Sequence, residues 1–440
     1  MTYDLTVLIA GGGVGGLALA QGLKKQGIHV RLFERQPEGS AAGYRLHMNG
    51  DGGTALEALL PPHLFELYLD TSRTDPEHER LVFLDNRLRF LGGRPHLGAL
   101  VRHRRKDTAV NRSTLRQILL SGLDDVIERG EVVGFEEDAS GVTVILADGR
   151  RERGDVLVGF DGVHSRVRAQ RLPEAAVVDL GLNGIYGRTP LPPDLQRSIV
   201  PELLDGFVIV MGPRLLENGV LAMGAFTPRV PVAEAAEARG LFPDLAPVGP
   251  YMMLGAGVPE SVWSEVGAEP ADASPEQLKA ALQVLVRGWH PQIVEMVDRA
   301  TPGDLFLTQL RYVDAPESWT ASRVTLAGDA IHGMPPTLGV GANLALRDAQ
   351  VLAGALVSVR DGRAASVTDA IGDYEREMRS YAFPLLRRAI TQEGSASGFT
   401  PRGMLRLMRM VGVRRLVRAA RSRKNTVGRL VGTEQKRNHS

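Results

Sequence analysis

Residues 5–34 read LTVLIAGGGVGGLALAQGLKKQGIHVRLFE, and this stretch decides the fold. Its first six residues are apolar and partly β-branched, as expected of a buried strand. A glycine-rich turn follows, and then a helical stretch over residues 14–26 that ends at Gly27, a residue type common at helix C-termini. Residues 28–33 form a second apolar run that ends beside Glu34. The order strand, helix, strand predicts a parallel βαβ unit.

The turn has the pattern G-x-G-x-x-G, and the residues expected at a cofactor are Gly11, Gly13, Val14, Gly15 and Gly16. Side chains at the glycines would hold the backbone away from a pyrophosphate, whereas the following helix N-terminus offers free N–H groups. Glu34 is placed to accept both ribose hydroxyls, and Arg35 belongs to the same predicted site. The alternative is a plain strand–helix turn. The motif alone does not separate NAD from FAD.

Composition excludes several classes of protein. The chain has 440 residues, 43% apolar and 23% charged, which is typical of a folded protein of two to three domains. Cysteine is absent, which excludes disulfides, cysteine-ligated zinc, iron–sulfur clusters and a thiol nucleophile. We expect no metal site, and a cytoplasmic protein, since a chain without cysteine fits a reducing compartment. The first twenty residues lack the basic start and unbroken apolar run of a signal peptide.

The net charge of +1 hides a basic tail. Residues 401–440 contain twelve Lys or Arg against one acid, so the preceding residues carry a net charge of −10. Arginines alternate there with leucine, methionine and valine, which favours an amphipathic helix packed on the body. A membrane-surface helix and contact with a partner subunit are the alternatives, so an oligomer stays open. Nucleic-acid binding is not expected, because the tail has no aromatic residues.

Two further segments repeat the pattern of a buried strand followed by Gly and Asp. Residues 142–168 read VTVILADGRRERGDVLVGFDGVHSRVR, in which a strand runs into Asp161 and Gly162. Residues 323–348 read RVTLAGDAIHGMPPTLGVGANLALRD, in which a strand ends at Gly328 and Asp329. A Pro/Gly-rich loop then leads to a helix that begins near Gly341.

Together the three segments resemble the class A flavoprotein monooxygenases, the family related to para-hydroxybenzoate hydroxylase, which carry a GxGxxG, a DG and a GD motif in this order. The resemblance spans nearly the whole chain. It implies an α/β fold, with a Rossmann-like FAD-binding domain interleaved with an α+β substrate domain on an antiparallel sheet, and a helical C-terminus. The implied FAD-binding domain is 1–70, 100–178 and 300–350, the substrate domain is 71–99 and 179–299, and the C-terminal helical region with the basic tail is 351–440. Antiparallel strands are expected over 206–211 and 220–226.

The resemblance also implies a set of residues around non-covalently bound FAD. Asp329 would accept the ribityl hydroxyls, and the helix N-terminus after it would face the flavin N1–C2=O edge. Arg112 and Val132 match positions that contact the cofactor, and Arg45 lies where a mobile loop lines the flavin. The remaining implied contacts are Asp161, Gly162, Gly328, Pro336, Gly339, Val340, Gly341, Ala342 and Asn343. Asp161 has the alternative of capping the next helix. Phe160 stands where the family usually has a small residue, and we expect it to crowd the cofactor or the pyridine-nucleotide path.

No acid or base is identified by the sequence. Arg45, His47 and Tyr186 are weak candidates on the substrate side, and His332 is interpreted as structural rather than catalytic. An aromatic share of 5% argues against a stacked cage of several rings.

The resemblance implies an FAD-dependent monooxygenase that hydroxylates an aromatic or polyketide-like small molecule through a flavin hydroperoxide. The partners are then the substrate, O2 and transient NADPH or NADH. A Baeyer–Villiger or epoxidising oxygenase, a non-oxygenating FAD reductase and a non-catalytic flavin-binding module are the alternatives.

Overall fold

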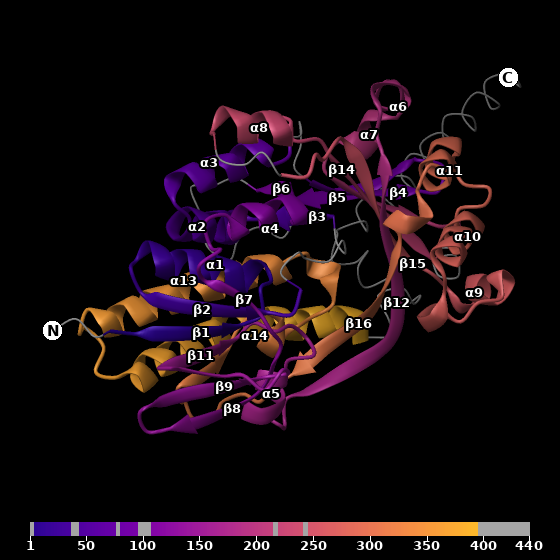
Figure 1. The fold of residues 1–440 in the computed structure, drawn as a ribbon. Coiled ribbons are helices and arrows are strands. Elements are labelled where there is room, and N and C mark those ends of the chain that lie inside the picture. The colour runs from indigo at the N-terminus through magenta and orange to yellow at the C-terminus, as the bar shows by residue number, and fades with distance from the viewer. Residues whose placement is uncertain are drawn as a thin grey trace, which may run out of the picture.

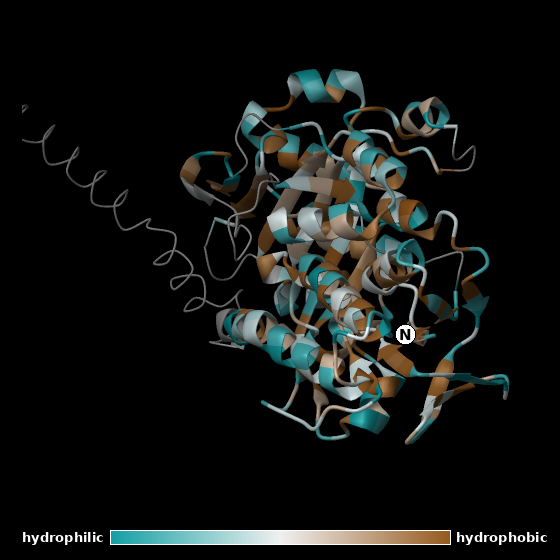
Figure 2. Cartoon of the chain, turned by 90° about the vertical axis from the view of Figure 1, so that its left-hand side faces the viewer, coloured by the Kyte–Doolittle hydropathy of each residue, from teal (hydrophilic) through white to brown (hydrophobic). Residues whose placement is uncertain are grey.

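The computed structural model describes residues 4–36, 44–75, 80–95, 107–213, 219–240 and 245–394. Two large sheets organise them, a five-stranded and a seven-stranded one (Figure 1). Apolar residues concentrate in the strands, whereas polar residues line the outer helices (Figure 2). Within the described ranges we find no helix that is long and apolar enough to cross a membrane. The basic tail lies outside them, so the hypotheses about residues 401–440 stay predictions.

The five-stranded sheet is parallel, in the order β17-β11-β1-β2-β7. Its strands are Thr6–Ala10 (β1), His29–Glu34 (β2), Ile127–Arg129 (β7), Val156–Gly159 (β11) and Val324–Leu326 (β17). β11 and β17 are buried throughout and β1 nearly so, which explains their continuous apolar sequence. Helix α1 (Val14–Lys25) connects β1 to β2, so the predicted strand–helix–strand unit is confirmed.

Helices pack on this sheet and on each other around one large core. α1 contacts α13 and α2, and α13 in turn contacts α14. The helices of this part are Gly50–Leu59 (α2), Pro62–Thr71 (α3), Arg112–Leu120 (α4), Arg166–Arg171 (α5), Val232–Ala238 (α8), Asp329–His332 (α12), Gly341–Arg360 (α13) and Val367–Gly394 (α14). The helix expected to begin near Gly341 begins there, and the described part of the C-terminal region is helical as expected.

Two small antiparallel sheets accompany the parallel one. The three-stranded sheet consists of Val132–Asp138 (β8), Gly141–Leu146 (β9) and Arg151–Gly154 (β10). The two-stranded sheet pairs Arg45–Met48 (β3) with Thr108–Asn111 (β6), and lies between the parallel sheet and the seven-stranded sheet in Figure 1.

The seven-stranded sheet has the order β16-β12-β15-β14-β13-β4-β5 and is antiparallel except for the pair β13–β4. Its strands are Arg80–Asp85 (β4), Phe90–Pro95 (β5), Ala176–Pro190 (β12), Phe207–Met211 (β13), Val220–Phe226 (β14), Tyr251–Gly257 (β15) and Phe306–Asp314 (β16). The antiparallel pair expected over 206–211 and 220–226 is confirmed as β13 and β14. The fold class is therefore as expected, whereas the residue ranges of the two domains stay predictions.

One face of this sheet is buried under helices. Alternate residues such as Ile185, Met223 and Leu254 form a second core with Trp263 and Leu282. The covering helices are Pro193–Ser198 (α6), Pro201–Leu204 (α7), Glu260–Val266 (α9), Pro275–Leu285 (α10) and Pro291–Asp298 (α11), and three short 3-10 turns span Pro270–Asp272, Pro302–Asp304 and Pro336–Leu338. Figure 1 shows α9, α10 and α11 on one side of the sheet and β3 and β6 on the other. The opposite face is therefore turned toward the glycine-rich turn.

Candidate functional site

The three glycine-containing motifs meet at one edge of the parallel sheet. Gly11 follows β1 directly, Asp161 stands two residues beyond β11, and Gly328 stands two residues beyond β17. Because these three strands are adjacent and parallel, their carboxyl ends share an edge. Ligands of open α/β sheets bind outside this edge.

The glycines of the first motif are needed for different reasons. Gly11 has a φ of +105°, and a Cβ there would collide with the carbonyl of Phe160. At Gly15 a Cβ would lie 2.5 Å from Cε1 of Phe160, and at Gly16 it would collide with the carbonyl of Gly11. A Cβ on Gly13, in contrast, would find no protein atom within 4 Å. Gly13 is therefore the position that leaves room for a ligand rather than for the protein.

Phe160 does not occupy that room. Its side chain is only 8% exposed, and its ring lies beneath the motif, against Gly15 and Gly328. At the glycine-rich turn, Gly15 provides the space that the ring needs. The expectation that Phe160 crowds the cofactor or the pyridine-nucleotide path stays a prediction.

Two protein groups hold the ribose side of the predicted site. The Glu34 carboxylate accepts hydrogen bonds from the backbone N–H of Gly12 at 2.6 Å and of Gln36 at 2.9 Å. Arg116, on α4, donates from Nε to the Gly12 carbonyl at 3.2 Å. The sequence analysis did not predict a role for Arg116. Its spacing of four residues from Arg112 could have indicated one, because residues four apart lie on the same face of a helix.

Asp161 caps a helix. Its Oδ2 accepts from the backbone N–H groups of Arg166 at 2.8 Å and Val167 at 3.2 Å, in the first turn of α5. Burial raises the pKa of Asp161, and the hydrogen bonds of that turn counteract the shift. The capping alternative is thus correct, and a contact of Asp161 or Gly162 with a cofactor stays a prediction.

Asp329 is the first residue of α12, at the edge where the three motifs meet. Its side chain is exposed, yet burial among surrounding protein atoms raises its pKa, while the charges of His332 and Arg112 lower it. A Cβ on Gly341 would lie 3.9 Å from Oδ1 of Asp329, so the carboxylate faces the first turn of α13.

The N-terminus of α13 is free of side-chain caps. Its N-cap residue is Val340, and no side chain accepts from the first turn. The same holds for α1, whose N-cap is Gly13. Both long helices therefore offer N–H groups and a positive dipole end to an acceptor. Pro336 and Gly339 are exposed beside α13, Val340 is buried, and Ala342 is half-buried.

The side chain of Asn343 binds protein rather than solvent. Its Oδ1 accepts from the backbone N–H of Asn49 at 2.9 Å, and its Nδ2 donates to the His47 carbonyl at 2.9 Å. The amide thus fixes α13 to the β3–α2 connection, and only the backbone of Asn343 remains for a cofactor.

Other predicted residues lie at the margins of the edge. Arg112 begins α4, and its charge acts on the Asp329 carboxylate. Arg35 is exposed at the end of β2. Val132 begins β8 and follows Gly130, whose N–H donates to the Glu34 carbonyl at 3.0 Å.

Arg45 and His47 project from one side of β3 toward the seven-stranded sheet. The guanidinium carbon of Arg45 lies 5.5 Å from the centre of the Phe207 ring, and a Cβ on Gly224 would lie 3.1 Å from its Cδ. Arg45 is 7% exposed. Nε2 of His47 lies 3.7 Å from Oδ2 of Asp107.

The sheet face opposite these residues is lined by aromatic rings. Tyr186 stacks beside Phe306, with centroids 6.0 Å apart and an interplanar angle of 21°. Tyr44 links Phe306, at 6.0 Å, to Tyr251, at 6.3 Å, and Phe226 stacks on Tyr251 at 5.1 Å. The low aromatic content argued against a stacked cage of several rings, yet several of the few rings are concentrated here.

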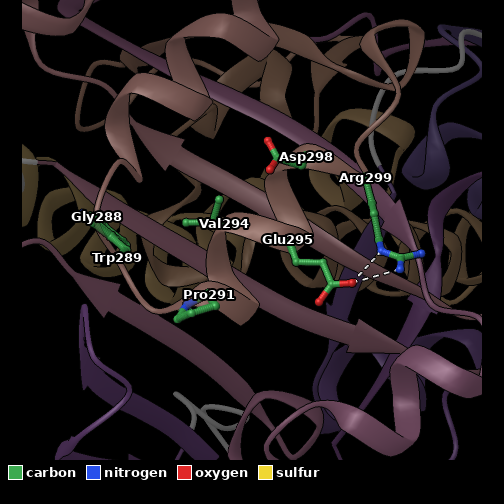
Figure 3. Close-up of a pocket in the computed structure, with 7 residues that line it drawn as sticks. All are labelled: Gly288, Trp289, Pro291, Val294, Glu295, Asp298 and Arg299. Atoms are coloured by element: carbon green, nitrogen blue, oxygen red, sulfur yellow. Dashed lines mark hydrogen bonds and ion pairs between the residues drawn. The ribbon is translucent and has the colours of Figure 1, made fainter.

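A hollow lies away from this site. It has a volume of about 700 Å³ and is lined by residues of α11 and of the segments on either side of it, among them Trp289, Glu295 and Arg299 (Figure 3). Glu295 and Arg299 pair with each other, and His290 caps α11 by accepting from the N–H of Gln292 at 3.3 Å. Trp289 is part of the second core, and we assign no ligand to this open surface.

The fold and the site define a Rossmann-type dinucleotide-binding protein. Its open glycine position, its two uncapped helix N-termini and its ribose-side carboxylate suit FAD. Residues 308–389 match the FAD binding domain family, and residues 9–81 match the NAD(P)-binding Rossmann-like domain. A Photorhabdus luminescens protein assigned as an FAD-containing monooxygenase is 30% identical over 88% of this chain and 98% of its own, with a TM-score of 0.73. The chain belongs to the family of FAD-dependent monooxygenases.

Curated relatives agree with this assignment. A dual O-methyltransferase/FAD-dependent monooxygenase of Cercospora beticola is 31% identical over 86% of this chain and 44% of its own length. The aurachin C monooxygenase/isomerase of Stigmatella aurantiaca is 29% identical over 80% of this chain and 81% of its own. The chain thus spans less than half the length of the first curated relatives that it matches.

Proposed function

We propose that this protein is an FAD-dependent monooxygenase that hydroxylates an aromatic or polyketide-like small molecule with NADPH or NADH and O2. In the balanced reaction, the nicotinamide supplies two electrons, one oxygen atom enters the substrate and the other leaves as water. FAD supplies the electron transfer between the nicotinamide and dioxygen. One observation carries the proposal: the edge of the parallel sheet where the three motifs meet lies opposite the face of the seven-stranded sheet that is lined by aromatic rings.

The chain's own residues bind, orient and exclude water. The first turns of α1 and α13 present backbone N–H groups to negative charge on the cofactor. Asp329 would accept hydroxyl groups of the ribityl chain, and Glu34 would accept those of the ribose. The rings of Tyr186 and Phe306 offer a planar apolar surface to a ring substrate and keep water from it. Arg45 is placed to hold an oxygen anion of the substrate.

A cationic surface beside the DG motif suits the phosphates of the nicotinamide. Arg311 Nη1 lies 3.0 Å from Nε2 of His164, and Arg35 and Arg168 act on the same imidazole through their charges. His164 and Arg35 are exposed. A cytoplasmic location completes the proposal and is supported by the absence of cysteine.

The test measures three quantities on one preparation: flavin absorbance near 450 nm, O2 uptake and product mass during NADPH oxidation with a panel of phenols and polyketides. Hydroxylated product equal to O2 consumed supports the proposal. An ester or epoxide product selects the other oxygenases. NADPH oxidation without oxygenated product selects a reductase, and bound flavin that no nicotinamide reduces selects a binding module.

A further inference from the structure

Asp348 is a fully buried carboxylate on α13. Its side chain and that of His332 are both 0% exposed. The neighbouring positions on this face of α13, Leu344 and Leu352, are apolar core residues. An ionised side chain in such surroundings is costly unless hydrogen bonds satisfy it, so Asp348 is not explained by packing.

Three donors from different parts of the chain converge on this carboxylate. The backbone N–H of Gly328 donates to Oδ2 at 2.7 Å, and Nε2 of His332 lies 2.7 Å from the same oxygen. The hydroxyl of Tyr381, on α14, donates to Oδ1 at 2.6 Å. The guanidinium carbon of Arg347 lies 4.1 Å from the centre of the Tyr381 ring.

Gly328 and His332 are the two ends of one short turn. Gly328 is the N-cap of α12, His332 is its last residue, and Asp329 is its first. Gly328 has φ +58° and ψ −144°, a backbone conformation that residues other than glycine rarely adopt. Asp348 therefore binds both ends of the turn that carries the Asp329 carboxylate.

Asp348 and the helix N-terminus that faces Asp329 belong to the same helix, α13. α13 begins at Gly341, which faces Asp329, and Asp348 lies on the same helix about two turns later. The separation between the Asp329 carboxylate and the first N–H groups of α13 is thus fixed by a single stretch of helix. Both groups face the predicted flavin site.

We infer that Asp348 is a positioning residue for FAD: held by Tyr381, it fixes the Gly328–His332 turn and so sets Asp329 against the N-terminus of α13. This inference rests on FAD binding at the site proposed above. Tyr381, on α14, contributes to the same positioning, because its hydroxyl binds Oδ1, the Asp348 oxygen that does not contact the turn.

The test compares Asp348→Asn and Tyr381→Phe with wild type. Asp361→Asn is the matched control, because it makes the same chemical change at the end of the same helix, where Asp361 is exposed and bonded to Arg360 and Arg363. The readouts are the dissociation constant of FAD on apoprotein, measured by flavin fluorescence, the absorption spectrum of the bound flavin and the Tm of apoprotein.

We expect FAD affinity to fall about tenfold or more in Asp348→Asn and about three- to tenfold in Tyr381→Phe, with a shifted flavin spectrum. The control should stay within about twofold of wild type. A lower apoprotein Tm with unchanged FAD affinity and spectrum would reduce Asp348 to a structural role and overturn the inference. If Asp348→Asn does not fold, Tyr381→Phe decides the question, since it removes a single hydroxyl. Wild type that fails to bind FAD contradicts the proposed function instead.

Discussion

The ring of Phe160 takes the space that a side chain on Gly15 would need, with Cε1 2.5 Å from the position of the missing Cβ. One glycine of the motif thus serves internal packing. Gly13, two residues earlier, has no protein atom within 4 Å of its missing Cβ. The same sequence pattern therefore contains positions that the fold requires and one that only a ligand would require.

Replacing Gly13 with alanine separates these roles. Its φ of −73° and ψ of −178° are accessible to alanine, so we expect the apoprotein to fold with a loss of about 1 kcal/mol or less. FAD affinity should fall at least about tenfold, because the methyl group meets the pyrophosphate. Titration of apoprotein with FAD and a melting curve measure both effects. Gly15→Ala is the comparison and should lower the Tm of apoprotein; unchanged FAD binding in Gly13→Ala would contradict the site.

Replacing Asp329 with asparagine tests the carboxylate at the edge where the three motifs meet. Burial raises the pKa of Asp329 above the ordinary 3.8, so the folded protein favours the protonated form. The carboxylate therefore opposes folding once the pH exceeds that ordinary value, and fully above the raised pKa. We expect Asp329→Asn apoprotein to have the higher Tm at pH 7, with the difference shrinking as the pH falls toward 4. FAD affinity should drop about tenfold or more. A lower Tm at pH 7 would refute the electrostatic argument.

Tyr186 tests the substrate face. Tyr186→Leu removes the ring that stacks beside Phe306, and we expect kcat/KM to fall about tenfold, mainly through KM, for any aromatic compound that stimulates NADPH oxidation. Tyr186→Phe keeps the ring and should stay within about threefold of wild type. Tyr312→Leu makes the same change elsewhere in the sheet and serves as the control. Equal losses in Tyr186→Leu and Tyr312→Leu would place the substrate elsewhere.

His164 reports on the nicotinamide surface. Burial lowers its pKa, and the charges of Arg311, Arg168 and Arg35 lower it further, so the imidazole is neutral at pH 7 in the free protein. Arg311→Gln should move the pKa back toward 6.5, as followed by the imidazole C2–H resonance and assigned with His164→Gln. Bound NADPH should raise the pKa of His164, and its affinity should therefore rise as the pH falls. A His164 resonance that ignores both Arg311 and NADPH would place the reductant on another surface.

The sequence sufficed for the elements whose local pattern is strong. The unit from β1 to β2, the strand before Gly328 and the start of α13 at Gly341 follow from apolar runs and glycines that are close together in the chain. Their meeting at one edge was predicted from a resemblance, since nothing local in residues 5–34 specifies that β11 becomes the neighbour of β1.

The contact partners of the side chains could not be predicted from local sequence patterns. The expectation for Asn343 concerned the backbone of the first turn of its helix, whereas its side-chain amide bonds to Asn49 and His47, some 300 residues earlier in the chain. The contact of Tyr381 with Asp348 and the ring cluster of Tyr44, Tyr251 and Phe306 are likewise long-range. No periodicity in a single sequence pairs such residues, so only the three-dimensional structure reveals these contacts.

The hydrogen bond between Tyr381 and Asp348 also bears on the order in which the site forms during synthesis of the chain. Gly11 and Tyr381 are separated by 370 residues, and β17, the last strand to join the parallel sheet, is Val324–Leu326. At ribosomal rates of about 5–20 residues per second, the glycine-rich turn waits roughly 20 to 70 s before α14 emerges. We therefore expect the flavin site to be completed only late in synthesis, and a chain that ends before α14 to lack the Tyr381 contact that holds Asp348.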